Sequence, residues 1–171
     1  MTKRDVFVDG SCADNGRPNA EGGWAIFATL QNSTDIIDDS IRIGKLRKGK
    51  QTNNRAELEA CYHGLIWIDE QMHDGTLYTL WSDSEVVVNG INGSSGRNAN
   101  RDIWEGVEAL CKKLVSENKI HVDGVQFIEG HKTESLDPRH INNCVCDKYA
   151  KQGANSLLLK PIEFERKCSN G

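Results

Sequence analysis

The sequence contains no apolar run that approaches the ~20 residues needed for a membrane-spanning helix. Its opening stretch, MTKRDVFVDG, also lacks the long apolar segment of a secretory signal. Internal repeats and low-complexity segments are absent as well. We therefore expect a cytoplasmic protein without a membrane partner. A chain of 171 residues fits one domain with a short tail.

Cysteine pairs with the spacing of a zinc site are also missing. The stretch CVC contains Cys144 and Cys146, and His131 and His140 lie near it in the sequence. The usual zinc spacing is C-x-x-C, and no second pair exists, so zinc is disfavoured here. Six cysteines indicate disulfides only in a small secreted chain, and we do not expect disulfides in an intracellular one.

An excess of basic residues is missing too. Lys and Arg number 21 against 25 Asp and Glu, which gives a formal net charge of −4. The charge of the whole molecule therefore argues weakly against a nucleic-acid partner. Binding to a polyanion would have to depend on local basic patches and on the charge of bound metal ions.

What is present is the pattern of an α/β domain over residues 1–155, in the order β-β-β-α-β-α-α-β-α. Strands are expected over residues 4–9, 22–30, 36–43, 77–83 and 122–130, and helices over 53–72, 84–91, 101–118 and 143–155. Three strands in an antiparallel meander come first, and crossover helices join the later, parallel strands. Residues 156–171 show no clear pattern and are interpreted as a C-terminal tail, either disordered or a docking strand.

Acidic residues lie at the ends of two of these strands. Asp9 follows the apolar run of the first strand, and Asp83 follows the strand LYTLWS. Because the functional crevice of an open α/β sheet lies beyond the carboxyl ends of its strands, we expect the two side chains to converge. Glu57 lies in the first turn of the helix after the hairpin, and Asp147 lies on the last helix.

Four carboxylates that gather in one place repel each other unless cations neutralise them. Carboxylate oxygens suit Mg²⁺ or Mn²⁺ rather than zinc. Two such ions ~4 Å apart form the arrangement used for in-line phosphodiester cleavage. The acids therefore predict a two-metal site; the alternative is a set of unrelated surface acids.

Five segments, VFVDGSC, TNNRAELEA, LWSDSEVVVNGI, IEGH and NNCVCDKYA, resemble type 1 ribonuclease H in order and approximate spacing over residues 4–155. The resemblance implies the ribonuclease H-like fold, with a five-stranded mixed sheet and helices on both faces. It implies a monomeric endoribonuclease that hydrolyses the RNA strand of RNA–DNA hybrids with two Mg²⁺ ions, with Mn²⁺ as a substitute, and leaves 5′-phosphate and 3′-hydroxyl ends. The catalytic residues that it implies are the metal ligands Asp9, Glu57, Asp83 and Asp147, together with the mobile-loop histidine His131.

The resemblance also implies substrate-binding residues, which are Ser11, Cys12, Asn15, Lys50, Thr52, Asn53, Asn54 and Asn143. Asn15, Asn53 and Asn54 match the family's residues that read the groove of the hybrid. A side-chain amide suits this role because it can both donate a hydrogen bond to a 2′-hydroxyl and accept one from it. Lys50 and Thr52 match a phosphate pocket for the DNA strand, with lysine in the place of the usual arginine. Asn54 has an alternative role as a helix cap, and Ser11 and Cys12 as turn residues.

The family's basic, Trp-rich protrusion has no counterpart, because the corresponding segment NGSSGRNANRD is rich in glycine and serine. A different segment, RIGKLRKGK over residues 42–50, has five basic residues and no acid. We hypothesise that it supplies the missing phosphate contacts; the alternative is a solvated loop. The stretch from His131 to Asp147 is longer than in common bacterial relatives, and Pro138 and Arg139 lie in the extra part.

Two other functions stay open at this point. One is a nuclease of the same superfamily that cuts double-stranded RNA or branched DNA, and the asparagine trio argues against it. The other is a hybrid-binding module without catalysis, and the presence of all four carboxylates argues against that.

Overall fold

The computed structural model describes residues 1–15, 17–93 and 96–155, and the expected tail over residues 156–171 lies outside them. The described residues form the strands β1 (Lys3–Ala13), β2 (Glu21–Leu30), β3 (Arg42–Lys45), β4 (Leu77–Ser82) and β5 (Ile120–Phe127). They also form the helices α1 (Asn53–Glu70), α2 (Glu85–Gly93), α3 (Arg101–Ser116) and α4 (Pro138–Ala154).

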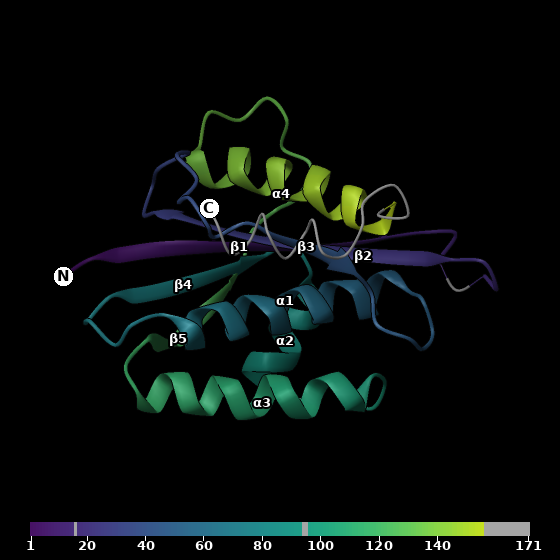
Figure 1. Ribbon diagram of the computed structural model, residues 1–171, viewed down its shortest axis with the longest axis horizontal. Coiled ribbons are helices and arrows are strands. Elements are labelled where there is room, and N and C mark those ends of the chain that lie inside the picture. Colours follow the sequence, from purple (N-terminus) through teal and green to yellow (C-terminus); the bar gives the residue numbers. More distant parts are fainter. Residues whose placement is uncertain (16, 94–95, 156–171) are drawn as a thin grey trace.

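The strands form one mixed sheet in the order β3-β2-β1-β4-β5. β1, β2 and β3 pair antiparallel, whereas β4 pairs parallel with β1 and with β5. α4 covers one face of the sheet, α1 covers the other, and α3 lies outside α1 (Figure 1). The predicted five-stranded mixed sheet with helices on both faces is confirmed.

Alternating side chains of β1 pack into two apolar clusters, one on each face of the sheet. Val6 and Val8 are fully buried in the larger cluster, on the side of α1 and α3. Phe7 lies in the smaller cluster beneath α4, where it packs with Cys146 and Ala150. β1 is therefore the central strand to which both helical layers attach.

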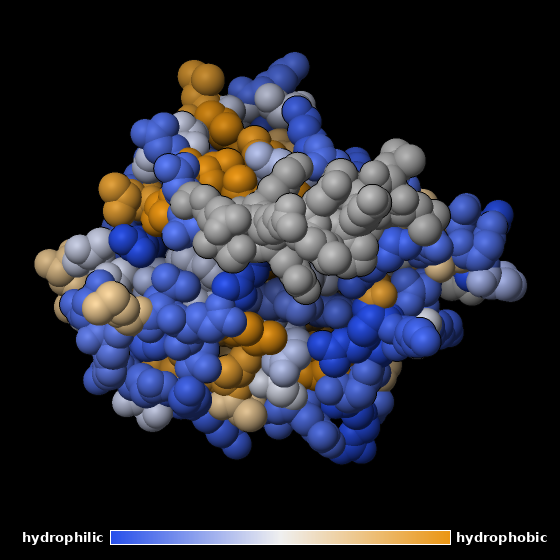
Figure 2. All heavy atoms as spheres, viewed as in Figure 1, coloured by the Kyte–Doolittle hydropathy of each residue, from blue (hydrophilic) through white to orange (hydrophobic). Residues whose placement is uncertain are grey.

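The surface is mainly hydrophilic on the face shown in Figure 2, where the hydrophobic residues form separate groups. Among the described residues, no helix has both the length and the apolar character needed to cross a membrane.

β1 is longer than predicted. It continues past Asp9 to Ala13, because β2 pairs with it up to the partners Ala13 and Glu21. The predicted Gly-Ser-Cys turn is therefore wrong, and these residues are extended strand. The parallel pairing with β4 ends at Phe7, opposite Trp81, so Asp9 lies just beyond the last pair on that side.

β3 is shorter than predicted and lies later in the chain. Of the predicted strand 36–43, only Arg42 and Ile43 belong to β3, and Ile36 forms an isolated bridge with Thr29. Asp39 has a left-handed backbone with φ of 64°, which interrupts a strand. Ser40 is buried in this turn, and its Oγ accepts from the Ala28 N–H at 3.0 Å.

α4 begins at Pro138, five residues before the predicted helix, so the end of the predicted polar loop is helical. Asp137 caps the helix, because its Oδ1 accepts from the Arg139 N–H at 2.9 Å. Proline is well suited to the first helical position, where an N–H has no helical partner. The polar stretch after His131 therefore runs into a helix at Pro138.

The short helix α2 was predicted correctly, whereas the cap of α1 was not. α2 forms where a short helix was predicted despite the β-branched residues of VVV, and burial of Val87 and Val88 explains why tertiary packing overrides propensity. The proposed capping role of Asn54 is wrong, since Thr52 Oγ1 caps α1 by accepting from the Arg55 N–H at 3.2 Å.

Candidate active site

Three carboxylates meet at one edge of the sheet. Asp9 belongs to β1, and Asp83 directly follows β4. Glu57 lies in the second turn of α1, so its predicted place in the first turn is wrong. One carboxylate oxygen of each lies within 4.8 Å of those of the other two. Asp9 is almost fully buried, with 1% of its surface exposed. Three of the four predicted metal-binding acids are therefore brought together.

Gly10 allows α1 to approach β1 closely enough for this meeting. A Cβ atom at Gly10 would lie 2.2 Å from the Ala56 carbonyl carbon and 2.4 Å from the Glu57 nitrogen. No side chain fits into that space. The absence of a side chain next to Asp9 thus lets the helix place Glu57 beside it.

The electrostatics of the cluster favour the protonated acids as long as no cation is bound. Burial, followed by repulsion from Glu57, raises the pKa of Asp9. Burial, followed by repulsion from Asp83, raises the pKa of Glu57 to about 8. Burial also raises the pKa of Asp83. The raised pKa values show how costly it is to keep three negative charges together at this edge.

The cluster fits a hard divalent cation. Asp9 Oδ2 and Glu57 Oε2 are both buried, and neither has a hydrogen-bond partner among the described residues. Asp9 Oδ1 accepts from the Gly10 N–H at 3.0 Å, which fixes the carboxylate in place. Buried acceptors without donors, supplied by carboxylates alone, are what Mg²⁺ or Mn²⁺ binds.

Asp147 lies beside the cluster on α4, outside the group of three. Its negative charge is a minor cause of the raised pKa of Asp9 and of Glu57. Its Oδ2 pairs with Lys151 Nζ at 3.0 Å, one helical turn further along α4. The fourth predicted ligand therefore acts on the other acids electrostatically, with a lysine as its present partner.

Asn143 and His131 both approach Asp83. The Asn143 side chain is buried and donates a hydrogen bond to the Asp83 carboxylate, and this bond and the charge of His131 oppose the effect of burial on the pKa of Asp83. A Cβ at Gly130 would lie 2.7 Å from Asp83 Oδ2, so the chain passes against the carboxylate there. His131 then takes a left-handed backbone with φ of 57°.

Most of the predicted substrate-binding residues lie where β1 ends and α1 begins. The Cys12 N–H donates to Asn53 Oδ1 at 2.9 Å, and the Asn53 N–H donates to Asn15 Oδ1 at 2.7 Å. Ser11 precedes Cys12 in β1, opposite Gly23. Thr52 is the helix cap described above, whereas Lys50 and Asn54 are exposed. The structure thus brings Cys12, Asn15 and Asn53 into one network.

The comparison with known proteins identifies the family. A family model described as RNase H matches residues 1–155. The chain belongs to the ribonuclease H family. A ribonuclease H from Haemophilus influenzae is 30% identical over 175 residues, which cover 94% of this chain and 95% of that relative. The resemblance to type 1 ribonuclease H is confirmed.

Solved structures of other proteins share the fold. The protease–reverse transcriptase of Prototype Foamy Virus matches with a TM-score of 0.68 and 17% identity. The match covers 90% of this chain and 21% of the viral chain, so this chain spans about a fifth of the viral chain's length. LC11-RNase H1 in complex with an RNA/DNA hybrid matches with a TM-score of 0.63 and 16% identity, over 91% of this chain and 99% of that one. At these identities the likeness shows the fold.

Sequence reasoning missed Arg55, a buried residue of this ribonuclease H fold. Arg55 Nη2 donates to Asp102 Oδ2 at 2.7 Å, and Nη1 donates to Asn100 Oδ1 at 3.2 Å. Nη2 also donates to the Lys48 carbonyl at 3.2 Å. Arg55 therefore ties the start of α3 to the loop before α1. Its partners are distant in sequence, and the only sequence signal is its place in the TNNR stretch.

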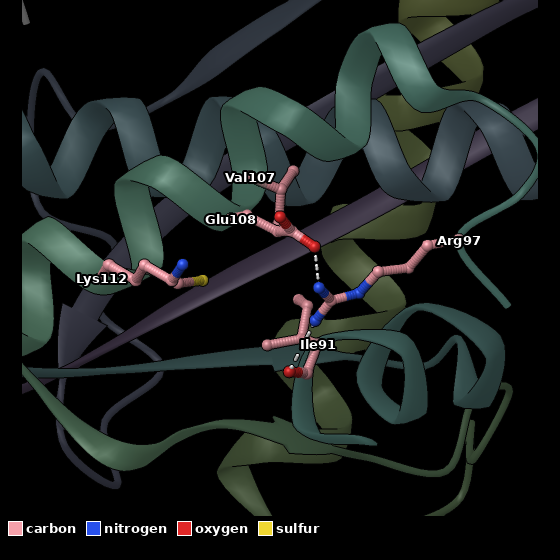
Figure 3. A pocket seen from close by; sticks show the side chains of 6 residues that line it. Ile91, Arg97, Val107, Glu108 and Lys112 are labelled. Carbon is pink, nitrogen blue, oxygen red and sulfur yellow. Dashed lines mark hydrogen bonds and ion pairs between the residues drawn. The ribbon is translucent and has the colours of Figure 1, made fainter. Parts of the chain in front are cut away.

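Arg97 lies in the connection between α2 and α3, the segment in which the sequence predicts no basic protrusion. Its side chain turns toward the protein, as Figure 3 shows. The Arg97 side chain donates to the Gly90 carbonyl at 2.7 Å, pairs with Glu108, and lies over the Trp104 ring. This arginine closes the end of α2 and is committed to internal contacts.

Proposed function

We propose that the chain is an endoribonuclease that hydrolyses the RNA strand of RNA–DNA hybrids with two divalent ions, Mg²⁺ or Mn²⁺, and leaves 5′-phosphate and 3′-hydroxyl ends. The observation that carries the proposal is the cluster of Asp9, Glu57 and Asp83 with its partnerless buried oxygens in a chain of the ribonuclease H family. Residues 1–155 are proposed as the catalytic domain. The monomeric state and the cytoplasmic location stay predictions.

Each residue of the cluster has a proposed role. Asp9, Glu57, Asp83 and Asp147 hold the ions, which supply activation of water and stabilisation of the leaving oxygen when bound. Asn143 orients Asp83 through its hydrogen bond. His131, whose charge acts on the same carboxylate, is proposed to accept or donate a proton.

The substrate is proposed from the neighbouring polar residues. The RNA/DNA hybrid bound by LC11-RNase H1, a structure of the same fold, supports a hybrid as ligand. Amides of Asn15, Asn53 and Asn54 are proposed to read 2′-hydroxyls of the RNA strand. Ser11 and Cys12 line the same edge, and Lys50 with Thr52 is proposed to bind a phosphate of the DNA strand.

A substrate panel tests the proposal. The protein is mixed with a labelled RNA–DNA hybrid, duplex RNA, duplex DNA and branched DNA, each with Mg²⁺, with Mn²⁺ or with chelator. We expect cleavage of the RNA strand of the hybrid alone, and only with an ion present. Cleavage of duplex RNA or branched DNA would support the other nuclease function, and hybrid binding without cleavage would support a binding module.

Replacement of Asp9 with asparagine tests the metal role. Asp9→Asn removes the buried charge that an ion requires. The rate of hybrid cleavage should therefore fall by at least about a thousandfold, which corresponds to an increase of about 4 kcal/mol in the activation barrier. Hybrid binding should stay measurable in an electrophoretic shift assay. Asp38→Asn, at an exposed position, serves as the control. Retained turnover in Asp9→Asn would contradict the metal role.

A further inference from the structure

The segment of residues 45–50, here called the basic loop, begins with the last residue of β3 and leads toward α1. It contains Lys45, Arg47, Lys48 and Lys50 and no acid. The sequence left open whether these cations bind phosphate or are merely solvated. The structure separates them into two groups with different surroundings.

Arg47 faces the protein. Its Nε lies 3.2 Å from Glu59 Oε1, and its own N–H donates to Glu59 Oε2 at 3.1 Å. Its guanidinium lies 5.3 Å from the centre of the Tyr62 ring. Glu59 is buried, with 2% of its surface exposed. Arg47 is thus an anchor of the basic loop, and its charge is neutralised by a buried acid.

The backbone of the basic loop is also held in place. Gln51 Nε2 donates to the Arg47 carbonyl at 3.0 Å, and Gln51 Oε1 accepts from the Gly22 N–H of β2 at 2.9 Å. Arg55 donates to the Lys48 carbonyl from the other side. These contacts fix the shape of the loop before any ligand binds, which lowers the entropy lost on binding.

The three lysines are exposed instead. Lys45 Nζ is 3.8 Å from Glu21 Oε2, and the two side chains are 40% and 52% exposed, a weak surface pair that water and salt screen. Among the described residues, Lys48 and Lys50 form no ion pair. Lys45 and Lys48 also line a cavity of about 460 Å³ together with Gly22 and Gln51.

The cavity lies at the same end of the sheet as the candidate substrate residues. Lys45 pairs with Gly23 of β2, and Gly23 pairs with Ser11 of β1. The Leu46 N–H donates to the Gly22 carbonyl, and Gly22 is opposite Cys12. The lysines of the loop are therefore continuous with the edge that carries Ser11 and Cys12.

We propose that Lys45 and Lys48 bind backbone phosphates of the nucleic-acid substrate, in addition to the phosphate proposed for Lys50. Arg47 does not bind phosphate and instead anchors the basic loop to the protein. This inference rests on the proposed function. A chain with a net charge of −4 gains nothing from its overall field, so affinity for a polyanion depends on such local lysines. Phosphate contacts position a duplex and raise affinity without reading sequence.

Salt-dependent binding of a hybrid tests the inference. The double variant Lys45→Gln/Lys48→Gln is compared with the wild-type chain in chelator, where nothing is cleaved and Mg²⁺ does not compete for phosphates. Affinity should fall about tenfold, and the slope of log K against log salt should become shallower by about 1 to 2, since each lost phosphate contact removes ~0.9.

A matched control separates a local effect from a change in net charge. Lys3→Gln/Lys112→Gln removes the same charge from two exposed lysines elsewhere, and its salt slope should equal that of the wild type. Arg47→Gln should lower the melting temperature, whereas the Lys45/Lys48 variant should not. If the Lys45/Lys48 variant and the control pair have equal affinity and slope, the inference is overturned.

Hybrids with neutral methylphosphonate linkages in one strand identify which strand supplies the phosphates. The difference between the wild type and the Lys45/Lys48 variant should vanish when the contacted strand is neutral. A difference that persists with either strand neutral would overturn the phosphate contact. If the wild type cleaves the hybrid and these tests fail, the proposed function stands and the inference falls; if the wild type neither binds nor cleaves it, both fall.

Discussion

Two glycines decide how closely the backbone approaches the carboxylates. Gly10 leaves room for the first turns of α1 beside Asp9, and Gly130 leaves room for the chain beside Asp83. The sequence marks both glycines only as parts of short motifs, and the neighbours that require them come from distant segments. The convergence of Asp9 and Asp83 was predicted from two strand ends, and Glu57 and Asp147 were added from their helices and the family resemblance, whereas the contacts that position the acids were not predicted.

Replacement of Gly10 tests the close approach of α1. The added methyl of Gly10→Ala would overlap the backbone of Ala56, so the helix must shift and the free energy of unfolding should fall by about 1–3 kcal/mol. Mg²⁺ affinity should fall as well, because Glu57 moves with the helix. Urea unfolding and calorimetric titration measure the two effects. Gly93→Ala is the control, since nothing lies within 4 Å of its added Cβ; equal effects of the two variants would contradict the packing argument.

His131 is proposed to assist catalysis without holding an ion. His131→Ala should slow single-turnover cleavage by about ten- to a hundredfold and should leave Mg²⁺ affinity nearly unchanged. This loss of rate is at or below the ~10²–10⁴-fold that a proton-transfer group usually contributes. His140→Ala is a control in the same stretch, where the ring contacts Ser135 Oγ at 2.7 Å. A His131→Ala rate equal to that of the wild type would exclude the role.

At the scale of elements, prediction succeeded where periodicity was strong and failed at boundaries. α1 and α3 were predicted nearly to the residue at their starts, because their apolar residues recur at helical spacing. The end of β1 and the position of β3 depend on which strand lies alongside, which no local pattern contains. α4 was predicted too late because its first turn, Pro138–Ile141, has few apolar residues.

The start of α4 depends on contacts that the sequence did not reveal. Asn142 is buried and its Nδ2 donates to the Ser33 carbonyl at 2.9 Å, and Arg139 lies over the Trp81 ring. These contacts attach the early part of α4 to the loop after β2 and to β4. The helix that carries Asn143 and Asp147 is therefore held at its N-terminal end as well as along the sheet.

Loss of the helix cap tests how much this end contributes. Asp137→Ala removes the hydrogen bond to the Arg139 N–H, so the free energy of unfolding should fall by about 1 kcal/mol, measured by urea denaturation. Glu134→Ala, an exposed change in the same loop, should have little effect. An unchanged stability of Asp137→Ala would show that the cap adds nothing to the packed helix.

At the scale of the whole molecule, the topology was predictable from the order of elements and the rule that parallel strands need crossovers. The carboxylate cluster follows from that topology, and it makes stability depend on pH. The folded pKa of Glu57 is raised above its usual 4.5 to about 8, so the folded chain holds a proton that the unfolded chain has already lost. Without metal, stability is therefore greatest at low pH within this range and falls as the pH rises from about 4.5 through about 8.

Thermal unfolding across this range tests the dependence. In chelator, the free energy of unfolding should fall by up to about 1.4 kcal/mol per pH unit for each carboxyl group that keeps its proton in the fold, and Mg²⁺ should remove most of the decline at pH 8. Glu57→Gln should make the decline shallower, because the proton that Glu57 retains is then missing, whereas Glu134→Gln should leave the profile as in the wild type. A chelated wild-type protein that gains stability toward pH 8 would contradict the repulsion within the cluster.

Asp9, Glu57 and Asp83 come from a central strand, the helix that follows the meander and the end of a crossover strand, so no short fragment of the chain contains all three acids of the proposed ion site. The contacts that bring them together span long stretches of sequence, and such contacts form late in folding. Divalent-ion binding should consequently appear only after β1, α1 and β4 have assembled. Ion uptake during refolding should thus report the assembly of these three elements, and a newly made chain should stay inactive until its fourth strand has docked.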